Sequence, residues 1–373
     1  MRFAVLAILL AMLAGTANSQ PLPTPKGVPA VDGILVAFKT HPIVFMENNE
    51  GRDGHDLAQQ HDFYAALVRD PRFAAEVGNV VVEVGNALHQ GVIDRYVNGE
   101  DVPYTELRKV WTDTVGWVPP PFNLGYVNFF AQVRAANLSL PKARRIHVWL
   151  GEPPLDWSKV KARGDALFNS FETQRDSYPA GLINREILTK SRKALVIYGG
   201  FHVLTDPIML GRYYQGRPTM GMLIEQQHPG AIFRVFTHAG GFENTACTLE
   251  REKNMAGLAV PALFTPLRGT SLDDPAFRQR CPMANITPSA PMPEKTRAEL
   301  RASLGLYRAG ASADAILYLG PVASLTASPF LPDIYLDTAY QKEVMRRMPQ
   351  NTTASELGIT VDKNPAAPGA FKY

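Results

Sequence analysis

Four apolar, strand-like segments of the sequence are each followed by side chains that could take part in acid–base chemistry. Glu47 ends PIVFME, Glu83 follows NVVV, Glu152 and Asp156 follow HVWL, and His202 follows ALVIY. Because ligands of open α/β sheets bind beyond the carboxyl ends of the strands, we expect these groups at one rim. Two carboxylates with different pKa values can act as general acid and base, and histidine with carboxylates can hold a divalent metal that activates water. Glu47, Glu83 and His202 are therefore candidate catalytic residues or, alternatively, metal ligands.

Other polar residues near these strand ends are candidates for binding a substrate. Asn49 and Asn86 follow the first two strands, Arg95 lies on the next expected helix, and Asp156 follows the third strand. Each also has a purely structural interpretation, such as a local ion pair for Arg95. Likewise, Glu83 would be favoured by the dipole at a helix N-terminus, and His202 could be a hydrogen-bonded turn residue.

Several familiar catalytic motifs are absent from the sequence. It contains no G-x-S-x-G nucleophile elbow and no H-E-x-x-H zinc motif. It also lacks the P-loop and the G-x-G-x-x-G dinucleotide fingerprint. The standard α/β-hydrolase triad, zincin and nucleotide-binding classes therefore have no support.

The elements that must position the candidate residues alternate between strands and helices. This order predicts an α/β fold with a mostly parallel sheet flanked by helices and a helical insertion. The expected strands are 33–38, 42–48, 79–85, 146–151, 194–200, 231–238 and 314–320. The expected helices are 55–69, 87–97, 125–137 and, with breaks, 164–192. We predict a single domain over 32–349, with helical insertions near 100–140 and 155–192.

The two ends of the chain are expected to lie outside this domain. Residues 1–19 resemble a secretory signal peptide, because Arg2 precedes an apolar run from Phe3 to Leu13 and small residues follow. That run of 11 residues is shorter than the roughly 20 that a membrane-spanning helix needs. We therefore expect export to the periplasm or the extracellular space, with no transmembrane segment in the mature chain. Residues 20–31 are predicted to be a proline-rich tether, and 350–373 a loose tail.

Composition and cysteine content narrow the class further. The 373 residues are 46% hydrophobic and 20% charged, which excludes a disordered chain. The formal net charge is +3 with scattered Lys and Arg, so we expect no nucleic-acid partner. Cys247 and Cys281 would suit one disulfide bond in an exported protein, or they are two unrelated thiols. Without a C-x-x-C motif, a redox or zinc-ribbon role has no support.

The order of the motifs resembles a known superfamily. It joins the erythromycin esterase-like proteins, the ChaN haem-uptake proteins and the Tiki metalloproteases. Its first strand ends in Gly-Glu-x-His, its second in Glu, and a later one in Gly-x-x-His. The corresponding residues here are Met46-Glu47-Asn48-Asn49, Glu83 and Gly199-Gly200-Phe201-His202. The segment Asn184-Arg185-Glu186-Ile187-Leu188 is similar to the family's Arg-acidic-x-x-Met/Leu segment, and the chain looks like a secreted bacterial branch over about 40–340.

One departure from the family pattern bears on the chemistry. Met46 and Asn49 stand where the family has Gly and His. Asn is a poor general base and a weak metal ligand, so a Tiki-like metal site would lack one imidazole. His55 or His61 could replace it, although His61 lies on the apolar side of its expected helix, which is typical of core packing.

Three functions follow from the residues and the resemblance. The first is an exported hydrolase of an ester, lactone or peptide, in which Glu47, Glu83 and His202 surround a water or a divalent metal. In this function Arg185 or Arg95 stabilises developing negative charge. The second is a haem- or small-ligand-binding protein of the ChaN type, for which Tyr198, Tyr213 and Tyr214 are potential axial ligands. The third is a catalytically inactive relative that binds a partner.

Overall fold

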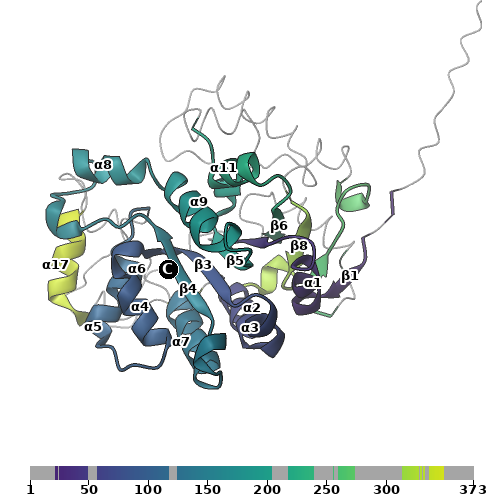
Figure 1. The fold of residues 1–373 in the computed structure, drawn as a ribbon, viewed down its shortest axis with the longest axis horizontal. Helices are drawn as coiled ribbons and strands as arrows, with labels where there is room; N and C mark the ends of the chain where they lie inside the picture. The colour runs from purple at the N-terminus through teal and green to yellow at the C-terminus, as the bar shows by residue number, and fades with distance from the viewer. Residues whose placement is uncertain are drawn as a thin grey trace, which may run out of the picture.

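Eight strands form one sheet in the part of the chain that the computed structural model describes (Figure 1). The described residues are 22–23, 25–48, 57–116, 124–203, 217–238, 255, 259–273, 313–326, 328–329, 331 and 336–347. The strands are β1 (Gly27–Pro29), β2 (Ile43–Glu47), β3 (Asn79–Asn86), β4 (His147–Glu152), β5 (Ala194–Tyr198), β6 (Ile232–Thr237), β7 (Ala262–Phe264) and β8 (Ala315–Tyr318).

The sheet is parallel wherever it carries candidate site residues. Its strand order is β1-β7-β8-β6-β2-β5-β3-β4, and only the pairings of β7 with β1 and β8 are antiparallel. Every residue of β2, β3 and β5 is buried, because these three strands lie inside the sheet and are covered on both faces. This is an α/β fold with a mostly parallel sheet, as predicted.

Helices cover both faces of the sheet (Figure 1). The helices are α1 (Ala30–Ala37), α2 (Ala58–Arg69), α3 (Pro71–Glu76), α4 (Gln90–Val97), α5 (Tyr104–Leu107), α6 (Lys109–Thr112), α7 (Gly125–Leu138), α8 (Ala166–Glu172), α9 (Ser177–Ile183), α11 (Met220–Gln227) and α17 (Thr338–Arg347). Four short helical turns matter below: η1 (Ala87–His89), η3 (Trp157–Lys159), η4 (Asn184–Leu188) and η5 (Gly200–Val203).

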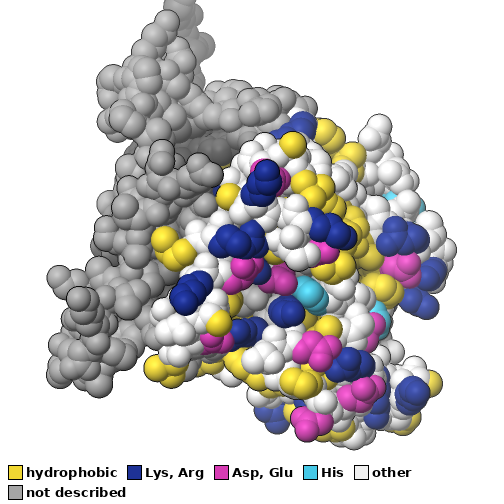
Figure 2. Space-filling view, turned by 90° about the vertical axis from the view of Figure 1, so that its left-hand side faces the viewer, with side chains coloured by type: hydrophobic (Ala, Val, Ile, Leu, Met, Phe, Trp, Pro, Cys, Tyr) yellow, Lys and Arg dark blue, Asp and Glu magenta, His cyan; other side chains and the backbone are white. Residues whose placement is uncertain are grey.

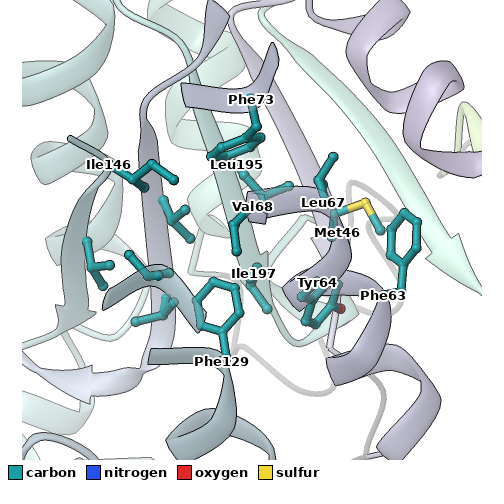
Figure 3. Close-up of a cluster of buried hydrophobic side chains, with 14 of the residues drawn as sticks. Met46, Phe63, Tyr64, Leu67, Val68, Phe73, Phe129, Ile146, Leu195 and Ile197 are labelled. Carbon is teal, nitrogen blue, oxygen red and sulfur yellow. The ribbon is translucent and has the colours of Figure 1, made fainter. Parts of the chain in front are cut away.

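Alternate strand residues pack into two separate cores. Met46, Leu195 and Ile197 point to the face covered by α1, α2, α4 and α7 (Figure 3). Their neighbours Phe45 and Val196 point to the opposite face, which α9 and α11 cover. Because both cores are apolar, the sequences of these strands are continuous hydrophobic runs. Burial of both faces also fixes the pairing register of neighbouring strands up to the carboxyl edge of the sheet.

The structure corrects two sequence predictions at the N-terminal side. Residues 33–38 were predicted as a strand but form most of α1, because a short, continuous apolar run suits a buried helix as well as a buried strand. The tether predicted for 20–31 ends earlier, since Gly27–Pro29 pairs with β7 as strand β1 and α1 begins at Ala30. The three-residue strand β7 gave no recognisable sequence signal.

The other predicted strands match observed ones to within two residues at each end. The predicted insertion ranges contain helices: α5, α6 and α7 lie in 100–140, and α8, α9 and η4 lie in 155–192. No helix among the described residues is long and apolar enough to cross a membrane. On the face shown in Figure 2, basic and acidic side chains are interspersed and do not form a continuous basic patch.

Some predictions fall outside the described residues. These are the signal peptide 1–19, the tail 350–373, and the residues Asn49, His55, Tyr213, Tyr214, Cys247 and Cys281.

Candidate functional site

Glu83 lies at the centre of a charged network at the carboxyl edge of the sheet. The regular pairing of β3 with both of its neighbours ends at Val82, so Glu83 is the first residue beyond it. The Glu83 side chain is 3% exposed. Its Oε2 accepts a hydrogen bond from the Gly199 N–H at 2.6 Å, and its Oε1 accepts one from Arg175 Nη2 at 2.6 Å. A carboxylate this deeply buried is stable only because charged and backbone donors surround it.

Arg175 joins Glu83 to a second buried carboxylate, that of Glu152. The Arg175 Nε donates to Glu152 Oε1 at 2.7 Å. Glu152 Oε2 accepts hydrogen bonds from the backbone N–H groups of Val115 and Gly116 at 2.8 and 3.0 Å. The guanidinium lies directly against Gly116, where a Cβ atom would be 2.1 Å from Arg175 Nη2. The segment after α6 therefore holds the Arg175–Glu152 pair in a fixed position.

His202 lies between two carboxylates, those of Glu83 and Asp176. Its Nε2 is 3.2 Å from Glu83 Oε1 and its Nδ1 is 2.9 Å from Asp176 Oδ1. The same Asp176 oxygen accepts the backbone N–H of Met220 at the start of α11, at 2.7 Å. The ring of Tyr198 meets the imidazole edge-on, with centroids 5.4 Å apart. These contacts fix both the orientation and the protonation of the imidazole.

The electrostatics of the network set the charge of His202 and Glu83 at neutral pH. Burial by itself would lower the pKa of His202, but Asp176 and Glu83 outweigh it and raise that pKa to about 10. Burial would likewise raise the pKa of Glu83, but His202 and Arg175, with the Gly199 N–H, lower it to about 2. His202 is therefore an imidazolium with two N–H donors, and Glu83 is an anion.

Glu47 approaches the same turn from the neighbouring strand. It pairs in register with Tyr198 at the end of β5, and its Oε2 accepts the Thr237 N–H at 3.1 Å. Its backbone carbonyl accepts hydrogen bonds from Gln60 and Tyr64 of α2. A Cβ on Gly200 would lie 2.4 Å from Glu47 Oε1, and one on Gly199 would lie 3.3 Å from Glu83 Oε2. Both carboxylates thus lie against the consecutive glycines of one turn.

Tyr198 contributes a buried hydroxyl to this region. Burial, with Glu152 and Glu83 adding to it, raises the pKa of Tyr198 well above its ordinary value, so the phenol is neutral. The hydroxyl oxygen has no hydrogen-bond partner among the described residues. It lies against Gly151, where a Cβ would be 1.9 Å away.

We expect Gly200→Ala to displace Glu47 and destabilise the protein. The added methyl group would lie 2.4 Å from Glu47 Oε1 and 3.0 Å from Phe236 Cε1, so one of them must move. The free energy of unfolding, measured by urea denaturation, should fall by about 1–3 kcal/mol. The control is Gly181→Ala on α9, whose Cβ would meet nothing within 4 Å and which should gain about 1 kcal/mol. An unchanged or raised stability in Gly200→Ala would contradict this placement of Glu47.

The structure brings three of the predicted site residues together and leaves four others elsewhere. Glu47, Glu83 and His202 meet around the Gly199–Gly200 turn. Arg185 is 61% exposed and bonds to Glu186, and Arg95 is 42% exposed and bonds to Glu106.

Asp156 and Asn86 have structural partners. Hydrogen bonds from Ser158 lower the pKa of the partly buried Asp156 to about 2, and Asp156 caps the turn η3. The buried Asn86 side chain donates to the backbone carbonyls of Asp113 and Leu155, at 2.6 and 2.7 Å.

Sequence reasoning missed Arg175 and Asp176 as site residues and left Glu152 without a role. Glu152 follows the apolar segment HVWL, just as Glu83 follows NVVV. The position after an apolar strand, which made Glu83 a candidate site residue, could therefore have identified Glu152 as one too. Arg175 and Asp176 lie between α8 and α9 in an irregular polar stretch that carries no motif. Arg175 is the guanidinium beside Glu83, and it lies 92 residues away in the chain.

The described residues do not fit the divalent metal or the haem that the resemblance implies. Among them no group of three or more His, Cys, Asp and Glu side chains is arranged to hold a metal ion. Both ring nitrogens of His202 lie against carboxylates of the protein, at 3.2 and 2.9 Å, so neither is directed at an open position. The Tyr198 hydroxyl is directed at the backbone of Gly151, which leaves no room for an axial bond to haem iron.

Comparison with known proteins gives two structural similarities. No protein-family model and no curated protein matches the chain. A type III effector, HopBA1, matches it at 9% identity and a TM-score of 0.35, over 58% of this chain and 87% of its own. A Bacillus cereus protein matches it at 10% identity and a TM-score of 0.42, over 78% of this chain and 99% of its own. At 9% and 10% identity and TM-scores below 0.5, neither similarity bears on the function of this chain.

Proposed function

We propose that the protein hydrolyses an ester, lactone or peptide bond by general acid–base chemistry at the carboxyl edge of its sheet. The observation that carries this proposal is the position of the buried His202 ring, which lies between Glu83 and Asp176 and shares the Gly199–Gly200 turn with the carboxylate of Glu47. A charged histidine among fixed carboxylates is a preorganised proton donor, and such perturbed groups gather at functional sites.

Each charged group has a role in this proposal. Glu47 takes a proton from the water that attacks the carbonyl carbon. The Nε2–H of His202 donates to the developing oxyanion and then protonates the leaving group. Its contact with Glu83 is the longer of its two carboxylate contacts, 3.2 against 2.9 Å, so a substrate oxygen could share that proton.

The remaining groups act as positioning residues. Asp176 and Glu83 hold the imidazole in its charged form and fixed orientation. Arg175 neutralises Glu83 and Glu152, so that these buried anions do not repel the oxyanion.

A second candidate, an inactive relative that binds a partner or small ligand, is favoured by one feature of the network. Both oxygens of Glu83 and both ring nitrogens of His202 already have partners within the protein. A network whose groups are all bonded could serve stability alone. The two functions differ in whether removal of Glu47 or His202 abolishes turnover.

The test is hydrolysis by the purified chain of a panel of p-nitrophenyl esters, lactones and chromogenic peptides. For any substrate that is turned over, we expect Glu47→Gln and His202→Gln to lower kcat by roughly 10²- to 10⁴-fold. The matched control is Glu172→Gln, at a carboxylate on α8 whose side chain is 44% exposed, and it should leave kcat unchanged. Turnover that both site variants retain would contradict the proposal. Absence of turnover across the panel in a folded protein would favour the inactive relative.

A further inference from the structure

A second concave site lies at the opposite, amino edge of the sheet. A cavity of about 370 Å³ opens between the loops that lead into three neighbouring strands, β6, β2 and β5. Residues 39–42 precede β2, residues 191–193 precede β5, and residues 228 and 231 precede β6. Because the strands run parallel, this cavity, the basic hollow, is at the other end of the sheet from Glu83. Its volume is in the range of small-molecule sites.

The lining of the basic hollow carries positive charge only. Lys39, Arg192 and Lys193 contribute three cations, and none of the described residues that line the hollow is Asp or Glu. None of the three forms a salt bridge with a described residue. The rings of His41 and His228 add two more nitrogen-bearing groups to the same lining.

Carboxylates on the adjoining helices are already engaged. Glu186 of η4 bonds to Arg185 and Lys190, and Glu225 of α11 bonds to Arg234. A concave surface that is lined by charges of one sign, here positive, concentrates anions.

Hydrogen bonds hold the three loops together. Ala194 N donates to Pro42 O at 2.9 Å, and Ile43 N donates to Ala231 O at 3.1 Å. The His228 ring is oriented by a 2.8 Å contact between its Nε2 and Asn184 Oδ1. Ser191, another lining residue, has a φ of 50°, a left-handed conformation that favours glycine. The cations therefore project from a rigid frame.

The floor of the hollow is apolar. Phe38 and Ala231 are buried, and Leu188 and Pro42 are partly buried beside them. An inorganic anion would contact the cations and leave this floor in water. A ligand with an anionic head and a small apolar body would use both parts of the hollow.

We propose that the basic hollow binds a small phosphate monoester, with the dianionic group among Lys39, Arg192 and Lys193 and the apolar body on Pro42 and Leu188. A phosphate dianion matches a cluster of cations, and guanidinium can bind two of its oxygens at once. The inference is independent of the hydrolase proposal, because it concerns the other edge of the sheet and other residues.

The test is calorimetric titration of the full chain with phenyl phosphate and with inorganic phosphate. We expect one phenyl phosphate per chain, bound about tenfold more tightly than inorganic phosphate because its ring leaves water. The double variant Arg192→Gln, Lys193→Gln should weaken phenyl phosphate binding by tenfold or more, on the order expected for the loss of two charge-assisted contacts. Both residues line the hollow, and the substitutions leave the Lys193 carbonyl that accepts a hydrogen bond from Asn79 unchanged, so the fold should persist.

The control removes the same charge from an exposed basic pair elsewhere. Lys142→Gln, Arg144→Gln, between α7 and β4, should bind phenyl phosphate as the parent chain does. Equal weakening in both double variants would mean that net charge, and not the hollow, attracts the anion, and would overturn the proposal. Failure of phenyl phosphate to bind would overturn it too. Equal affinity for both probes would contradict the contact that we propose between the apolar body of the ligand and the apolar residues of the hollow.

Discussion

Arg175→Met is expected to lower the free energy of unfolding by about 3–5 kcal/mol, the cost of leaving a buried charge without its partner. Arg175 lies between the carboxylates of Glu83 and Glu152, which are 3% and 1% exposed. Methionine fills much of the space of the arginine stem but supplies no donor, so two anions would remain close together in a region of low polarity. Urea denaturation at neutral pH measures the loss.

The size of this effect depends on burial, and an exposed arginine provides the comparison. Arg72 also bridges two carboxylates, Asp70 and Asp32, at 2.7 and 2.8 Å, but its side chain is 49% exposed. Since solvent screens such pairs, Arg72→Met should change stability far less. Equal losses in the two variants would contradict the buried network.

Two further measurements separate charge from geometry at Arg175. Arg175→Lys keeps the charge but, as a single ammonium, cannot reproduce the planar pair of contacts, so it should recover only part of the loss. The deficit of Arg175→Met should also shrink as the pH is lowered, because the buried Glu83 carboxylate, once it has lost the guanidinium that helps to lower its pKa, takes up a proton more readily.

The second large effect is a loss of stability as pH rises, caused by His202. Its pKa is raised from 6.5 to about 10 in the folded protein, by Asp176 and Glu83 acting against burial. A raised pKa stabilises the fold fully below the unfolded value of 6.5, and this contribution disappears as pH climbs toward 10. We expect a loss on the order of 5 kcal/mol across this window, at about 1.4 kcal/mol for each unit by which the pKa is raised.

Glu83 should produce the opposite effect, a loss of stability as the pH falls. Its pKa is lowered from 4.5 to about 2, chiefly by His202 and Arg175 acting against burial. A lowered pKa stabilises the fold above 4.5, and the contribution is lost as pH falls toward 2. Together the two groups predict a stability maximum between the two windows, near pH 4.5–6.5.

The variant His202→Gln tests whether His202 causes the loss of stability at alkaline pH. Gln keeps a hydrogen-bond donor but cannot titrate, so the decline between pH 6.5 and 10 should flatten in urea denaturation series. His41→Gln is the control, because the His41 ring bonds to Thr40 and not to a carboxylate, and this variant should keep the parent profile. A decline of the same depth in all three proteins would show that His202 is not its source.

The sequence alone predicted the parallel sheet and three residues of its carboxyl edge. The runs NVVV and ALVIY are strongly apolar because both faces of their strands are buried, and this pattern can be recognised in the sequence itself. Once the strands are parallel, the residue after each run must lie at one edge. Glu47, Glu83 and His202 could therefore be placed together without any knowledge of side-chain contacts.

A local pattern could not distinguish every element. The apolar run at 33–38 suits a buried strand or a buried helix, and it became α1 because Gly27–Pro29 takes the place beside β7. The strand β7 itself is too short to show a period. In both places the outcome depends on pairing with distant segments.

The identity of the cation beside Glu83 was decided by the tertiary structure alone. Arg185 lies in a family-like segment but points to solvent, whereas Arg175, in a stretch without a motif, is brought between Glu83 and Glu152. The charge of His202 was equally unreadable from sequence, because it depends on Asp176 lying 2.9 Å from the ring. Strand positions follow from hydrophobic periodicity, which is local. Charge states follow from burial and from neighbours that only the folded chain brings together.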